Sequence, residues 1–148
     1  MTFNNQSNNL KQNKMKSTIL TLALMATFAF SHSQNAYETS MNKGLEMLHV
    51  SDNYETAYNC SNYFERIADA NKKEWLPLYY AAYTSMASGF YETDADKKDA
   101  LYQRGLTYIE KANAIQGDES EILALEAYIK LMYIANDAMK RAPSQTGE

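Results

Sequence analysis

The chain has 148 residues, of which 45% are hydrophobic and 22% are charged. This length allows one domain, and the composition is typical of a soluble globular protein, which excludes a fibrous or fully disordered chain. The single Cys excludes a disulfide framework within the chain, and two His residues are too few for a His-rich metal site.

Residues 1–33 have the pattern of an export signal. Three Lys residues precede the apolar run 19–30, which ends at Ser31-His32-Ser33. A positively charged segment, a short apolar run and small residues before the cut are typical of a secretory signal peptide. We therefore expect cleavage between Ser33 and Gln34 and a product that is secreted or periplasmic. The alternative, a membrane anchor, needs about 20 apolar residues.

The expected mature chain, residues 34–148, is acidic. The segment removed by cleavage holds three of the 14 basic residues and none of the 18 acidic ones, so residues 34–148 carry a net charge of −7. Such a chain is a poor nucleic-acid binder, because neutralised phosphates supply most of the non-specific affinity. We expect no stable membrane span after cleavage, and no lipid anchor, since Cys60 lies far from the cleavage point. Met15 is an alternative start that would exclude residues 1–14.

Helical spacing of apolar residues recurs through residues 34–141, and no alternating strand pattern is present. The short connections between the expected helices predict antiparallel neighbours, either in a closed bundle or in a solenoid of stacked hairpins. Residues 34–141 are thus expected to form one helical domain, with a disordered tail over 142–148. The five expected helices cover residues 36–50, 52–70, 74–89, 97–115 and 119–140.

Local signals predict where these helices begin and end. Asp52 and Glu55 have the spacing of a capping box at the start of the second helix. Asn71 is expected to adopt the left-handed conformation after that helix. Pro77 fits the first turn of the third helix, where amides have no partner within the helix. Gly89 is expected to end the third helix.

The sequence contains an internal repeat. Residues 60–68 and 105–113 both have a small residue followed by Tyr, a large apolar residue, Glu and a basic residue at matching positions, at an offset of 45 residues. The third and fifth helices align at the same offset, which places Tyr83 on Tyr128. A fixed period with alternating helix types indicates a repeat architecture, so it favours stacked hairpins over a closed bundle.

The pattern Trp75-x-x-Leu78-Tyr79-x-x-Ala82, followed by Gly105-x-x-x-Ile109-x-x-Ala112, resembles a tetratricopeptide repeat. The stretch 75–83 is also similar to secreted repeat proteins of the Bacteroidetes type. The resemblance is strongest over 72–116 and implies a short all-α solenoid of antiparallel hairpins, whose first helices line a concave groove. The chain departs from the family pattern at Tyr79 and in its long connection over 89–99. The fifth helix would then be a cap, or the last helix of an array that is incomplete or that pairs with a partner.

No residue pattern predicts catalysis, a metal site or a cofactor. His49 is expected to be half-exposed near a helix end, and no Ser or Cys has the His-Asp context of nucleophilic catalysis. Cys60 lies on an apolar helix stripe and is expected in the core. Asp94-Ala95-Asp96 lacks the Gly and the terminal Glu of a calcium-binding hand motif.

Tyrosine is the unusual feature, since all 12 Tyr residues lie in residues 34–148. One interpretation is that they fill the spaces between stacked helices. The other is a binding surface, to which the ring and the hydroxyl both contribute. The tetratricopeptide resemblance implies that Tyr80, Tyr83 and Thr84 face the concave groove, with Tyr128 one repeat later.

These observations predict a function in binding. We expect an exported, non-enzymatic scaffold that binds a protein or peptide partner through its concave face, with no cofactor. The alternative is a structural helical bundle that serves as an accessory subunit of a cell-envelope complex. An enzyme or ligand-binding bundle is a third hypothesis that no residue pattern supports.

Overall fold

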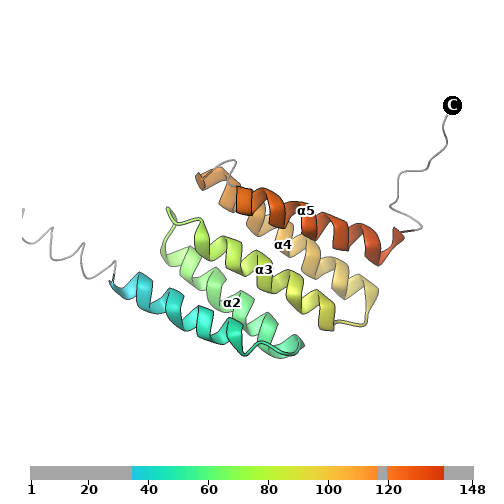
Figure 1. The fold of residues 1–148 in the computed structure, drawn as a ribbon, viewed down its shortest axis with the longest axis horizontal. Helices are drawn as coiled ribbons and strands as arrows, with labels where there is room; N and C mark the ends of the chain where they lie inside the picture. The colour runs from blue at the N-terminus through green and yellow to red at the C-terminus, as the bar shows by residue number, and fades with distance from the viewer. Residues whose placement is uncertain (1–34, 117–119, 139–148) are drawn as a thin grey trace, which may run out of the picture. The chain divides into compact units, whose positions relative to one another are not determined.

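The computed structural model describes residues 35–116 and 120–138 (Figure 1). Every regular element in these two ranges is a helix, which confirms the predicted all-α fold of about five helices. Within the described residues, no helix combines the length and the hydropathy that a membrane span requires. The expected export signal and the expected tail lie outside the described residues. The helices cover residues 35–49, Tyr54–Ala70 (α2), Leu76–Tyr91 (α3), Ala95–Gln116 (α4) and Ser120–Asn136 (α5).

The labelled helices pack in chain order. α2 packs against α3, α3 against α4, and α4 against α5, and α3 also touches α5. Figure 1 shows these helices side by side with nearly parallel axes, and the short connections over 71–75 and 92–94 make successive helices antiparallel. Among the described residues, α2 and α5 do not form a packed pair. The helices therefore form an open row of hairpins and do not close around one axis.

Small polar residues set the spacing between neighbouring helices. The Ser61 hydroxyl of α2 donates a hydrogen bond to the Ala81 carbonyl oxygen of α3 at 2.9 Å. The Ser85 hydroxyl of α3 donates to the Leu101 carbonyl oxygen of α4, also at 2.9 Å. Both serines are fully buried, and a buried hydroxyl needs such an acceptor. These two bonds hold three consecutive helices at close distance.

The α2–α3 pair is repeated in the α4–α5 pair. Cys60 on α2 and Gly105 on α4, which are 45 residues apart, are both buried. Phe64 and Ile109, at the same offset, are also both buried. The repeat that the sequence predicts is thus also a repeat of burial along the helices.

The ends of α2 differ from the prediction. Asn53, and not Asp52, is the capping residue, because its Oδ1 accepts a hydrogen bond from the Thr56 amide at 3.0 Å. The Thr56 hydroxyl oxygen accepts from the Asn53 amide at 3.2 Å, which completes the capping box without Glu55. Asn71 has a φ of −130°, so the predicted left-handed conformation is wrong.

The third helix begins at Leu76, two residues later than predicted, and it also ends later. Pro77 lies in its first turn, whereas Gly89 lies inside the helix, which continues to Tyr91. A Cβ atom at Gly89 would lie 2.5 Å from Cε1 of Tyr102 on α4. Gly89 therefore makes room for the Tyr102 ring, and the prediction that it ends the helix is wrong.

The connection between α3 and α4 is shorter than predicted. Asp94 Oδ1 accepts hydrogen bonds from the amides of Asp96 and Lys97, both at 3.0 Å. A side chain that accepts from these amides acts as a helix cap, so α4 starts at Ala95. The carboxylate of Asp94 thus has a structural role in this connection.

Arg104 joins α4 to α2. Its Nη2 donates a hydrogen bond to Glu65 Oε2 at 3.1 Å and another to Asn62 Oδ1. Its Nε donates to the Tyr108 hydroxyl at 2.8 Å, and the guanidinium lies 5.0 Å from the ring centroid of Tyr58. These contacts hold together two helices that are not neighbours in sequence.

Candidate partner-binding surface

The outward face of α3 carries a stripe of aromatic residues. This stripe consists of Tyr79, Tyr83 and Phe90, with the small Ala87 between the last two. The four residues are spaced by four, four and three positions, so they lie on one face of the helix. Tyr83 is 39% exposed and Phe90 is 48% exposed. The opposite side of α3 holds fully buried residues such as Ala81 and Ser85. The stripe is therefore the surface that α3 presents to solvent.

Tyr128 of α5 extends this stripe onto a second helix. Its ring centroid lies 6.4 Å from that of Phe90, with the two rings tilted by 52°. Tyr128 is 44% exposed, so the contact leaves part of this residue accessible. We name Tyr79, Tyr83, Phe90 and Tyr128 the aromatic patch.

Tyr80 supports this patch from one side. Its ring stacks on Phe64 of α2, with centroids 5.1 Å apart and an interplanar angle of 23°. It also makes an edge contact with Tyr79 at 5.4 Å. Tyr80 is half-buried and Phe64 is fully buried. Tyr80 thus links the exposed rings to the core between α2 and α3.

The structure corrects one predicted binding residue. Thr84 is fully buried, and its hydroxyl donates a hydrogen bond to the Tyr80 carbonyl oxygen at 2.7 Å. Thr84 follows Tyr83 by one residue, which turns its side chain by about 100° around the helix. That rotation moves it from the exposed face to the buried face, so it is not available to a partner.

Phe90 and Tyr91 are exposed residues that the sequence prediction missed. The prediction ended the third helix at Gly89, and so it left both residues in a connection. Phe90 follows Tyr83 by seven residues, the spacing that returns to the same face of a helix. This spacing was the signal that could have identified it.

Burial shifts the pKa of two groups on α2 and α3. Burial raises the pKa of the Cys60 thiol to about 11, so the reactive thiolate is scarce at neutral pH. Burial also raises the pKa of Tyr79, and the neighbouring Tyr80 adds to this shift. No group of three or more His, Cys, Asp or Glu residues in the described ranges could hold a metal ion. The patch offers rings and hydroxyls, which suit binding.

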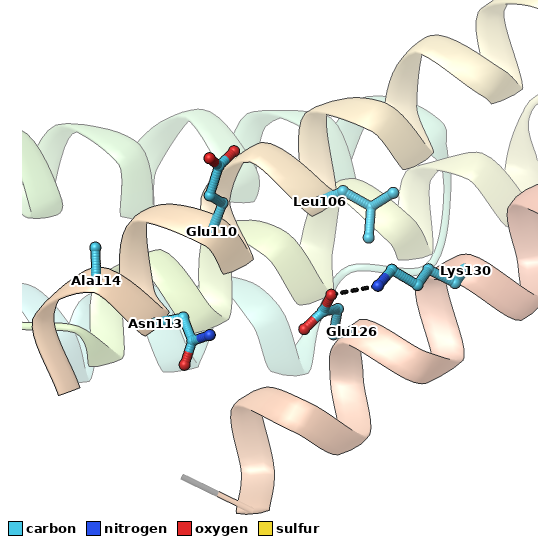
Figure 2. Close-up of a pocket in the computed structure, with 6 residues that line it drawn as sticks. All are labelled: Leu106, Glu110, Asn113, Ala114, Glu126 and Lys130. Carbon is cyan, nitrogen blue, oxygen red and sulfur yellow. Dashed lines mark hydrogen bonds and ion pairs between the residues drawn. The ribbon is translucent and has the colours of Figure 1, made fainter. Parts of the chain in front are cut away.

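A separate groove lies between α4 and α5 (Figure 2). Its volume is about 420 Å³. Glu126 and Lys130 form an ion pair on the α5 side, and Glu110 lies on the α4 side. The lining residues are Leu106, Glu110, Asn113, Ala114, Glu126 and Lys130.

No protein-family model, curated protein or solved structure matches the chain. The tetratricopeptide resemblance therefore stays a prediction from the residues. The function proposed below rests on the exposed surface of α3 and α5.

Proposed function

We propose that the protein is an exported, non-enzymatic helical-repeat scaffold that binds a peptide segment of a partner protein on the aromatic patch. The observation that carries this proposal is the joint exposure of Tyr83, Phe90 and Tyr128 on two adjoining helices. Gathered exposed apolar groups mark interaction surfaces, and Tyr is enriched among the residues that dominate binding energies.

The support beneath the patch favours tight binding. α3 is held by α2, α4 and α5, and Tyr80 is stacked on the buried Phe64. A pre-organised aromatic side chain loses little conformational entropy when a partner binds, so more of the contact energy appears as affinity.

The charge of the chain favours a partner segment with basic and apolar residues. Residues 34–148 carry seven more acidic than basic side chains. Glu121 is near enough to Tyr79 to raise its pKa further, which places a carboxylate beside the patch. Lys and Arg side chains bind both to carboxylates and to the faces of aromatic rings.

Selection from a displayed peptide library tests the binding proposal. Peptides that bind the unchanged chain should bind the Tyr83→Ala, Tyr128→Ala double variant at least about tenfold more weakly, because hot-spot residues contribute about 2 kcal/mol or more. Tyr54→Ala is the matched control, since Tyr54 is 37% exposed but lies at the start of α2. Equal affinity for the double variant, or no selected peptide, would overturn the proposal.

The export part of the proposal rests on the pattern in residues 1–33. Expression of the whole chain in a bacterium, followed by mass spectrometry of the periplasmic and extracellular fractions, should identify a product that begins at Gln34. A cytoplasmic product that still contains residues 1–33 would contradict export. It would leave the peptide-binding test unaffected.

A further inference from the structure

Apolar residues surround α5 on two opposite sides. Ile122, Leu125 and Ile129 are buried against the preceding helices. On the other side, Leu123 is 44% exposed and Leu131 is 57% exposed, and Ala127 and Ile134 lie on the same stripe. A helix that carries apolar residues on two opposite sides normally packs against neighbours on both. We name Leu123, Ala127, Leu131 and Ile134 the outer stripe.

The equivalent side of α3 is covered by other helices. Leu78 corresponds to Leu123 and Met86 to Leu131 at the 45-residue offset, and both α3 residues are buried. Ala82, which corresponds to Ala127, is fully buried, and its carbonyl oxygen lies 3.4 Å from the place of a Cβ atom on Gly105 of α4. The side of α3 that corresponds to the outer stripe is thus covered by a packed helix, whereas the outer stripe of α5 is exposed.

The outer stripe is complementary to a second copy of itself. Leu123, Ala127 and Leu131 are spaced by four residues, so the small residue lies midway between two Leu residues. In an antiparallel pair with its two-fold axis at Ala127, Leu123 of one copy faces Leu131 of the other. A two-fold interface requires such self-complementarity, because the same surface serves both subunits.

The charged residues beside the outer stripe are also compatible with a two-fold axis at Ala127. Glu126 and Lys130 both lie on the flank of α5 that borders the α4–α5 groove (Figure 2). In the antiparallel arrangement, this flank meets the same flank of the second copy. Glu126 of each copy then lies about 3 Å along the helix axis from both Lys130 and Glu126 of the other copy, at about 1.5 Å of rise per residue. Two attractive contacts thus outnumber one repulsive contact, so the charges favour this pairing.

We propose that the protein forms a two-fold dimer through antiparallel contact of the outer stripes of two α5 helices. The contact rests on α5 alone, a helix of 17 residues, and it therefore belongs among the smaller and weaker protein interfaces. We expect a monomer–dimer equilibrium in the micromolar range, with the small Ala127 side chains at the crossing point. This inference does not depend on peptide binding by the aromatic patch.

Sedimentation equilibrium of the full-length chain tests the dimer. The unchanged chain should reach twice its monomer mass as its concentration rises, and Leu131→Asp should remain monomeric, because the new carboxylate would be buried in the contact. Leu45→Asp, at an exposed Leu of the helix over 35–49, is the matched control and should dimerise normally. Circular dichroism checks that each variant is folded.

Charge variants test the predicted symmetry. Glu126→Lys places two Lys residues next to each other across the axis, and Lys130→Glu places two Glu residues there, so each variant alone should dimerise about tenfold more weakly. An equal mixture of the two variants should form a mixed dimer with both ion pairs restored. Any of three results would overturn the proposal: a monomeric unchanged chain at several hundred micromolar, which would leave the stripe to another partner; a Leu131→Asp dimer; or no mixed dimer.

Discussion

Gly89 of α3 and Tyr102 of α4 lie so close that no side chain fits between them: a Cβ atom on Gly89 would be 2.5 Å from Cε1 of Tyr102. Tyr102 is 3% exposed, so its ring has little room to move. Overpacking costs about 1–3 kcal/mol, whereas Ala gains roughly 1 kcal/mol over Gly inside a helix. Gly89→Ala should therefore lower the free energy of unfolding by about 1 kcal/mol in urea titrations.

Removal of the large ring provides the control for this prediction. In the Tyr102→Leu background, the added cost of Gly89→Ala should disappear, because the atom that meets the new methyl group is absent. A Gly89→Ala chain that is more stable than the unchanged chain would show that helix propensity outweighs the contact.

Arg104 should contribute more to stability than the exposed ion pairs do. Its guanidinium bonds to Glu65 and Tyr108 at once, and its side chain is only 23% exposed. Arg104→Ala should lower the free energy of unfolding by about 1–3 kcal/mol, because hydrogen bonds of a charged group are lost together with packing. Arg104→Lys should recover little, since an ammonium group cannot bond in this planar, multiple fashion.

The pair of Lys72 and Asp69 is the matched control. Their side chains are 73% and 68% exposed, and such surface pairs contribute at most about 1 kcal/mol. Lys72→Ala should therefore change thermal unfolding far less than Arg104→Ala. Equal effects of the two variants, or a fully stable Arg104→Lys chain, would contradict the conclusion that Arg104 stabilises the contact between α2 and α4.

Helix number and the repeat could be predicted from the sequence, because both depend on apolar spacing within short windows. The need for Gly at position 89 could not, since it depends on contact with Tyr102, which lies 13 residues later and across a turn. The buried state of Thr84 was missed for a related reason: the groove was assigned by family likeness, and one residue of rotation separates the two faces of α3.

The binding surface could be predicted only in part. Tyr83 and Tyr128 were identified from the sequence and are exposed, yet Phe90 was lost with the early helix end. Ile122, Leu125 and Ile129 form the buried side of α5. Its outer stripe became visible only when the structure showed which side of α5 the preceding helices cover.

The stability of the protein should fall at alkaline pH. Burial raises the pKa of Cys60 from 9.0 to about 11, so the folded state keeps a proton that the unfolded state releases. Stability contributed by this group is complete below pH 9 and is lost as the pH rises toward 11. Burial also raises the pKa of Tyr108, which extends the loss above about pH 10, the usual value for Tyr.

The Cys60→Ala variant separates these two contributions. Its melting temperature should fall less than that of the unchanged chain between about pH 9 and pH 9.5, because Tyr residues of the unfolded chain are still mostly protonated there. Melting curves by circular dichroism between pH 8 and pH 11 give the comparison. Parallel pH profiles for the two chains would contradict the assignment to Cys60.

The Tyr80→Ala and Tyr83→Ala variants should separate effects on stability from effects on peptide binding. Tyr80→Ala removes the ring that stacks on the buried Phe64, so it should lower the free energy of unfolding by about 2–3 kcal/mol. Tyr83→Ala removes an exposed ring, so its effect on stability should be within about 1 kcal/mol, whereas its effect on peptide affinity should be large. Urea unfolding and fluorescence titration with a selected peptide measure the two quantities. If Tyr83→Ala unfolded as readily as Tyr80→Ala, its ring would belong to the core, and the patch would lose its central contact.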